Sequence, residues 1–105
     1  MRIILIGQAA FGAKVLETLL EKGENVVAAY TPPDKPSGRP DPLNELALSK
    51  NISTFQPETY KDDQVFKEFK GLNPDLTVMA FVTDIIPARY FELPSKGTIN
   101  YHPSL

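Results

Sequence analysis

The sequence contains no cysteine, a single histidine, no cluster of basic residues and no long apolar run. The absence of cysteine excludes disulfides, thiolate metal ligands and a cysteine nucleophile, and it suits a reducing cytosol, where we expect this protein. One histidine supplies metal ligands poorly, so we predict no metal site. The apolar run at Ile3 to Ile6 is far too short for a signal peptide or a membrane span, so we predict no membrane partner.

The sequence also has little excess charge of either sign: it contains 11 Lys and Arg residues and 13 Asp and Glu residues, for a net charge of −2. Nucleic-acid binding requires clustered cations on a basic surface, so this segment is not expected to bind nucleic acid by itself. A chain of 105 residues, 42% of them hydrophobic, fits one small domain with its own core. No internal repeat or domain boundary divides it.

Short apolar runs that are typical of buried strands alternate with stretches of helical periodicity. The ten prolines fall almost entirely at the joints between these segments. The alternation predicts an α/β fold: a Rossmann-like open parallel sheet with strand order 3-2-1-4-5 and helices on both faces. The predicted strands are Ile3 to Ile6, Val26 to Tyr30, Ile52 to Phe55, Leu76 to Phe81 and Gly97 to Tyr101, and the predicted helices run from about Phe11 to Gly23, Asp41 to Asn51, Asp62 to Leu72 and Pro87 to Leu93.

This strand order places a topological switch point between the first and fourth strands. Ligands in open α/β sheets bind beyond the carboxyl ends of the strands, at such a switch point. Three loops should crowd around one cleft there, at residues 7–12, 81–86 and 100–105. The first of these loops has Ala9 where a G-x-G-x-x-G fingerprint needs glycine, so we interpret Gly7 and Gly12 as structural turn residues.

Asn100 and His102 are the most chemically suggestive pair, because side chains at positions i and i+2 of a strand share a face. An amide can donate a hydrogen bond to a developing oxyanion, and an imidazole can exchange a proton near neutral pH. The alternative is that both side chains merely satisfy backbone groups in a turn. The loop at 81–86 is likewise open to two interpretations: it holds a flat heterocycle, or it plugs the sheet end with Ile85 and Ile86 in the core.

Several stretches together are similar to the folate-dependent formyltransferases. They cover nearly the whole chain: Arg2 to Gly7 with Phe11, then residues 31–39, 55–59, 72–76 and 97–105. The resemblance implies transfer, or hydrolysis, of the formyl group of 10-formyltetrahydrofolate. It also implies that Asn100 binds the carbonyl oxygen as it becomes an oxyanion and that His102 acts beside it as an acid, a base or an electrophile.

The same resemblance implies a folate-binding set. The pterin of the family lies against the loop that matches Asp84, Ile85 and Ile86, and the family's Ser-Leu-Leu-Pro stretch begins here with Ser104 and Leu105. The family's catalytic aspartate, which orients the histidine, lies downstream of the residues given. We therefore expect residues 1–105 to be the incomplete N-terminal part of the catalytic domain, inactive alone, with an exposed sheet edge that favours self-association.

The motifs do not select one member of the family. The enzymes that formylate methionyl-tRNA are resembled by residues 36–39, residues 55–59 and Asn100. The hydrolase domain of 10-formyltetrahydrofolate dehydrogenase is resembled by residues 7–8, 11–12, 41–43 and 101–105. We favour the former, with tRNA bound through regions beyond this chain. A non-catalytic module that binds folate or a nucleotide remains an alternative from another class.

Overall fold

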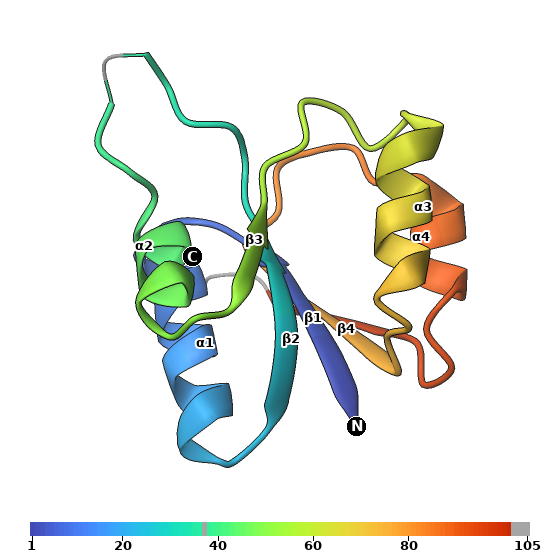
Figure 1. Cartoon of the computed structure of the whole chain (residues 1–105), viewed down its shortest axis with the longest axis horizontal. Helices are drawn as coiled ribbons and strands as arrows, with labels where there is room; N and C mark the ends of the chain where they lie inside the picture. The colour runs from blue at the N-terminus through green and yellow to red at the C-terminus, as the bar shows by residue number, and fades with distance from the viewer. Residues whose placement is uncertain (37, 102–105) are drawn as a thin grey trace.

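The computed structural model describes residues 1–36 and 38–101 and contains one five-stranded parallel sheet between two layers of helices (Figure 1). The strand order is β3-β2-β1-β4-β5, which confirms the predicted α/β topology and switch point. The elements are β1 (Arg2–Gly7), α1 (Ala9–Glu21), β2 (Asn25–Tyr30), α2 (Pro42–Ser49), β3 (Ser53–Phe55), α3 (Asp63–Gly71), β4 (Leu76–Ala80), α4 (Ala88–Glu92) and β5 (Thr98–Tyr101).

The central strands are apolar on both faces because each face is covered by helices. Residues 3–7 of β1 and all five residues of β4 are buried. A strand buried on both sides cannot alternate apolar and polar residues, which is why β1 reads as a continuous run. Helices α1 and α2 lie on one face of the sheet and α3 and α4 on the other (Figure 1).

Two hydrophobic clusters follow from this arrangement, one on each face of the sheet. The cluster beneath α1 and α2 contains Leu5, Leu16 and Leu43, together with Val78 of β4. The cluster beneath α3 and α4 is largely aromatic and contains Ile4, Ile6, Tyr30, Tyr60, Phe69, Met79 and Tyr90. Successive strand residues enter opposite clusters, as the two-residue period of a strand requires.

The aromatic cluster is held by directional contacts as well as by burial. The rings of Tyr30 and Phe55 stack with centroids 4.9 Å apart, and Tyr90 meets Phe66 and Phe69 edge-on at 5.0 Å. The buried hydroxyl of Tyr90 donates to the Tyr60 carbonyl at 2.9 Å, so this polar group is satisfied without water. The contact attaches α4 to the segment that precedes α3.

Two aspartates start helices as their sequence positions predict. The Asp41 carboxylate accepts from the Leu43 N–H at 2.8 Å at the start of α2, and Asp62 accepts from the Gln64 N–H at 2.8 Å at the start of α3. At the end of α1, Gly23 adopts φ +76, the left-handed conformation that commonly follows a helix C-terminus.

The boundaries differ from prediction at two places that matter for the site. Helix α1 begins at Ala9 rather than at about Phe11, and β4 ends at Ala80 rather than at Phe81. Both Ala9 and Phe81 adopt left-handed backbone conformations, with φ +65 and +59. A left-handed residue turns the chain out of the ladder, so Phe81 opens a loop instead of extending the strand.

Candidate functional site

The carboxyl ends of β1, β4 and β5 are level with one another. Gly7 of β1 pairs with Ala80 of β4, and Ala80 pairs with Tyr101 of β5. One residue further, the Phe81 N–H donates to the Tyr101 carbonyl at 3.1 Å. The loops that follow β1 and β4 therefore start side by side at one edge of the sheet, beside the end of β5, as the topology predicted.

Gly7 is required by a close approach of two backbones at this edge. A Cβ atom built at Gly7 would lie 2.5 Å from the carbonyl oxygen of Ala80, closer than real Cβ atoms come. Gly12 is less constrained, since a Cβ there would lie 3.1 Å from the flexible end of Leu43. The structural interpretation of both glycines is consistent with these contacts.

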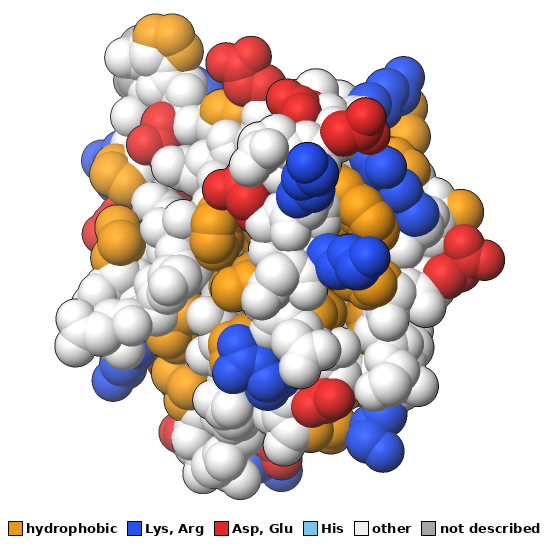
Figure 2. Space-filling view, turned by 45° about the vertical axis from the view of Figure 1, so that its right-hand side comes forward, with side chains coloured by type: hydrophobic (Ala, Val, Ile, Leu, Met, Phe, Trp, Pro, Cys, Tyr) orange, Lys and Arg blue, Asp and Glu red, His pale blue; other side chains and the backbone are white. Residues whose placement is uncertain are grey.

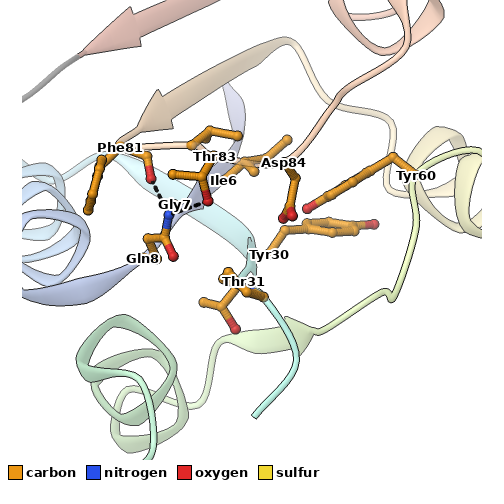
Figure 3. Close-up of a pocket in the computed structure, with 11 residues that line it drawn as sticks. Ile6, Gly7, Gln8, Tyr30, Thr31, Tyr60, Phe81, Thr83 and Asp84 are labelled. Carbon is orange, nitrogen blue, oxygen red and sulfur yellow. Dashed lines mark hydrogen bonds between the residues drawn. The ribbon is translucent and has the colours of Figure 1, made fainter. Parts of the chain in front are cut away.

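Gln8 joins the two loops across the switch point. Its Nε2 donates to the Phe81 carbonyl at 2.9 Å and to the Thr83 Oγ1 at 3.0 Å, the two dashed lines of Figure 3. Its own carbonyl accepts from the Gly12 N–H at 3.0 Å, so the same residue also starts α1. The sequence carries no motif that would mark Gln8, because its partners lie 73 and 75 residues away.

Asp41 fixes the start of α1 from the other side. Both of its carboxylate oxygens accept from the Ala9 N–H, at 3.0 and 2.9 Å, while one of them also accepts from Leu43. One carboxylate therefore satisfies amides of two helices and holds the left-handed Ala9 in place.

The loop that follows β4 presents the predicted folate-binding residues unequally. Ile86 is half-buried and packs against the aromatic cluster, whereas Ile85 is 78% exposed and Asp84 is also exposed. The core interpretation of this loop therefore holds for Ile86 but is wrong for Ile85, and the binding of a heterocycle by the loop stays a prediction. Among the described residues, the backbone N–H groups of 82–86 form no hydrogen bond, so they can serve a ligand.

Two buried tyrosines lie beside this loop. Figure 3 shows Tyr60 and Asp84 pointing toward one another, with the Tyr30 ring next to them. Burial raises the pKa of the Tyr60 phenol well above its ordinary value, and the Asp84 carboxylate raises that pKa further. The Tyr30 pKa is raised first by burial and then by Glu68. Both phenols are therefore neutral hydrogen-bonding groups at physiological pH rather than bases.

The polar tips of Tyr30 and Thr31 are buried at the end of β2. The Tyr30 hydroxyl and the Thr31 Oγ1 have no hydrogen-bond partner among the described residues. Both residues, with Gly7, Gln8 and Asp84, line a narrow hollow at the carboxyl ends of β1, β2 and β4. Unpartnered buried hydroxyls are uncommon in folded proteins, so these two groups are unusual features of this end of β2.

Asn100 lies on β5 opposite Met79 and its side chain is exposed. Register partners on adjacent parallel strands point to the same face of a sheet, so Asn100 is on the Met79 face. Val82 and Ile86 pack against the cluster of that same face. The structure thus places Asn100 at the same edge and on the same side as the predicted folate loop. His102, Ser104 and Leu105 lie outside the described residues.

The described residues show two further features that bear on function. Within 1–36 and 38–101, no group of three or more His, Asp or Glu side chains could hold a metal ion. No helix in the same part of the chain has the length and apolar character needed to cross a membrane. Figure 2 shows cationic and acidic side chains interspersed over one face, rather than a field of one sign.

A family model described as "Formyl transferase" matches residues 1–105. The chain belongs to this family. It is 43% identical over its whole length to the methionyl-tRNA formyltransferase of Alkaliphilus oremlandii, and 40% identical over 99% of its length to that of Trichlorobacter lovleyi. It spans 36% and 34% of these two relatives.

A solved structure shows the same fold. The phosphoribosylglycinamide formyltransferase of Bacillus halodurans superposes on the whole chain with a TM-score of 0.72, at 17% sequence identity. The chain covers 57% of that structure. At this identity the likeness supports the architecture, while the assignment to the formyl transferase family rests on the sequence.

Proposed function

We propose that this chain forms the folate-binding and formyl-handling part of an enzyme that transfers a formyl group from 10-formyltetrahydrofolate. The observation that carries the proposal is the placement of Asn100 and the loop at 82–86 at one sheet edge and on one face. Family membership supports the reaction class, and this shared edge and face support the choice of site.

The loop at 82–86 suits a flat, polar-edged heterocycle such as a pterin. Ile85 offers an exposed apolar surface for one side of the ring. The backbone N–H groups beside it, which have no hydrogen-bond partner in residues 1–36 and 38–101, can meet ring acceptors. Asp84 adds an acceptor for ring amino and imino groups. This division between apolar contact and main-chain hydrogen bonding is typical of small-molecule sites.

Asn100 and His102 are proposed as the catalytic pair. Bound 10-formyltetrahydrofolate would supply an activated formyl carbonyl at the end of β5. The Asn100 amide would donate to the carbonyl oxygen as negative charge develops, and His102 would hold or move the proton of the attacking group. Ser104 and Leu105 are proposed to continue this wall of the site.

The proposed formyl acceptor is methionyl-tRNA, because the two relatives named above carry that name. The net charge of −2 does not favour nucleic acid binding by this segment alone, so tRNA contacts are assigned to regions beyond it. Hydrolysis of the formyl group, with water as acceptor, is the competing outcome and is separated by the assay below.

Titration calorimetry with 5-formyltetrahydrofolate, a stable analogue, tests the binding half of the proposal. The folded chain should bind it, and Ile85→Asp should abolish binding because it places a charge against the ring. Leu48→Asp is the matched control, because Leu48 is also an exposed apolar residue, at 57%. It lies on α2, which covers the face of the sheet opposite to the one that carries the proposed site (Figure 1). A folded wild-type chain with no affinity for the analogue contradicts the proposal.

The catalytic half is tested in a protein that joins this chain to the remaining segments of its relatives. His102→Ala should lower kcat by about 10²–10⁴-fold, and Asn100→Ala by about 10²–10³-fold, with little change in folate affinity. Formylated methionyl-tRNA and free formate should be measured in the same reactions. Formate as the sole product would assign a hydrolase instead, and full activity of His102→Ala would remove its catalytic role.

A further inference from the structure

Gln8 is the residue that ties the loop after β4 to the loop after β1. The two hydrogen bonds from its Nε2, to the Phe81 carbonyl and the Thr83 Oγ1, bracket the start of the loop at 82–86 (Figure 3). The orientation of the Gln8 side-chain amide is fixed by its partners: the Phe81 carbonyl oxygen can only accept a hydrogen bond, so the Gln8 Nε2, and not its Oε1, must face it.

Phe81 connects Gln8 to β5 through its backbone hydrogen bonds. Its N–H donates to the Tyr101 carbonyl on one side, and its carbonyl accepts from Gln8 on the other. Its φ of +59 is costly for an aromatic residue and persists only where neighbouring contacts hold it. Gln8 and Tyr101 are those contacts, and Tyr101 follows Asn100 directly in the chain.

Gln8 is itself held rigidly. It lies at the start of α1, where its carbonyl accepts from Gly12, and the next residue, Ala9, is fixed by both oxygens of Asp41. Residues 82–86, by contrast, have no backbone N–H hydrogen bond among the described residues. A rigid donor therefore faces a loop that has few restraints of its own.

We propose that Gln8 is a positioning residue that holds the loop at 82–86 in its ligand-binding conformation relative to β5. It touches no reacting atom; it acts through Phe81 and Thr83. The inference rests on the proposed function for the identity of the ligand, but its structural part stands on the hydrogen bonds alone. Without Gln8 the loop would sample more conformations, and only a fraction of molecules would be competent to bind.

Gln8→Met tests the proposal, because methionine has a similar length and no donor. Gln56→Met is the matched control: the Gln56 Nε2 also bridges a carbonyl and a side-chain oxygen, Pro32 at 3.1 Å and Asp34 at 3.0 Å, but in the loop that follows β2 rather than the loop that follows β4. In the unliganded chain, the backbone ¹⁵N order parameters of 82–85 should fall below about 0.6 in Gln8→Met only. The Phe81 amide should also exchange faster.

The same variants are then titrated with 5-formyltetrahydrofolate. Gln8→Met should weaken binding by about three- to tenfold, as expected for loss of a net hydrogen-bond contribution, and Gln56→Met should leave it unchanged. Gln8→Glu keeps an acceptor for the Thr83 hydroxyl but cannot donate to Phe81, whereas Thr83→Val removes only the Thr83 contact. If Phe81 is the decisive partner, Gln8→Glu should resemble Gln8→Met and Thr83→Val should resemble wild type.

The outcomes separate the inference from the proposed function. Unchanged order parameters and Phe81 exchange in Gln8→Met overturn the inference, whatever the wild type binds. A loosened loop with unchanged folate affinity also overturns it, because positioning must show in binding. A wild-type chain that binds no folate overturns the proposed function and the folate assignment, while the order parameters still decide whether Gln8 orders the loop.

Discussion

Replacing Gly7 by alanine should separate β1 from β4 at the sheet edge that carries the site. The new Cβ would lie 2.5 Å from the Ala80 carbonyl oxygen and 3.2 Å from the Ala80 Cβ. Ala80 is fully buried and lies in the ladder between β1 and β5. The obstacle is backbone, so no side-chain rotation can relieve the clash.

The expected cost is about 3 kcal/mol, at the upper end of the range for overpacking in a core. Relief requires the end of β1 to move away from β4, which weakens the pairing of Gly7 with Ala80 and shifts Gln8 relative to Phe81. Domains of this size have a free energy of unfolding of about 5–15 kcal/mol, so the change removes a large part of it.

Two other glycines provide a graded comparison. At Gly12 the added Cβ would lie 3.1 Å from Leu43 Cδ2, the end of a flexible side chain, so we expect a loss below about 1 kcal/mol. At Gly71, the last residue of α3, nothing lies within 4 Å, and alanine should stabilise the protein by about 0.5–1 kcal/mol through its higher helix propensity. The predicted order, from most to least stable, is therefore Gly71→Ala, wild type, Gly12→Ala and Gly7→Ala.

Urea unfolding followed by far-ultraviolet circular dichroism measures all four proteins. With a slope of about 1–3 kcal/mol/M, the Gly7→Ala midpoint should fall by about 1–3 M. A Gly7→Ala protein within about 0.5 kcal/mol of wild type would refute the argument that close backbone approach requires glycine there. A Gly71→Ala protein as unstable as Gly7→Ala would refute it too.

Three further predictions concern other contacts. Asp41→Ala should lower the free energy of unfolding by about 2 kcal/mol, because the Asp41 carboxylate accepts hydrogen bonds from amides of two helices. Asp62→Ala removes a single helix cap and should lower it by about 1 kcal/mol. Equal melting temperatures of the two variants would contradict this prediction. Burial raises the pKa of Tyr30 and Tyr60, so the folded state keeps two protons that the unfolded state releases above about pH 10. The stability that these two phenols contribute is therefore complete below that pH and is lost as the pH rises above it. Phenolate absorbance at the ordinary pH in the folded protein that disappears in Tyr30→Phe or Tyr60→Phe would contradict this prediction. Arg89→Ala should lower the free energy of unfolding by about 1 kcal/mol, measured by thermal unfolding. The Arg89 guanidinium lies 4.3 Å from the centre of the Phe66 ring on α3 and 3.1 Å from the Asp63 carboxylate. No measurable loss of stability would show that these contacts are not maintained in solution.

The Arg89 experiment has a natural control in Lys14→Ala. Lys14 makes an ion pair with Glu17 at 3.2 Å, and both side chains are more than half exposed, so its loss should change stability little. A difference between the two variants isolates the ring contact that links α4 to α3.

The sequence by itself determined the architecture. Hydrophobic periodicity is local, and the handedness of strand-helix-strand connections leaves few ways to order five parallel strands. The two-residue period of a strand predicts one shared face for Asn100 and His102, whereas the pairing of Asn100 with Met79, which identifies that face, comes from the tertiary structure. Helix starts at Asp41 and Asp62 were predictable for the same reason, since capping acts over two or three residues.

Only the tertiary structure decided how the loops at the sheet edge are held. The Gln8 amide meets Phe81 and Thr83 more than seventy residues away, and Asp41 reaches Ala9 across 32 residues. Phe81, whose left-handed conformation ends β4 at Ala80, is likewise bonded to residues distant in the chain, Gln8 and Tyr101. Such contacts depend on where the strand ends meet in space, and local propensity carries no information about that.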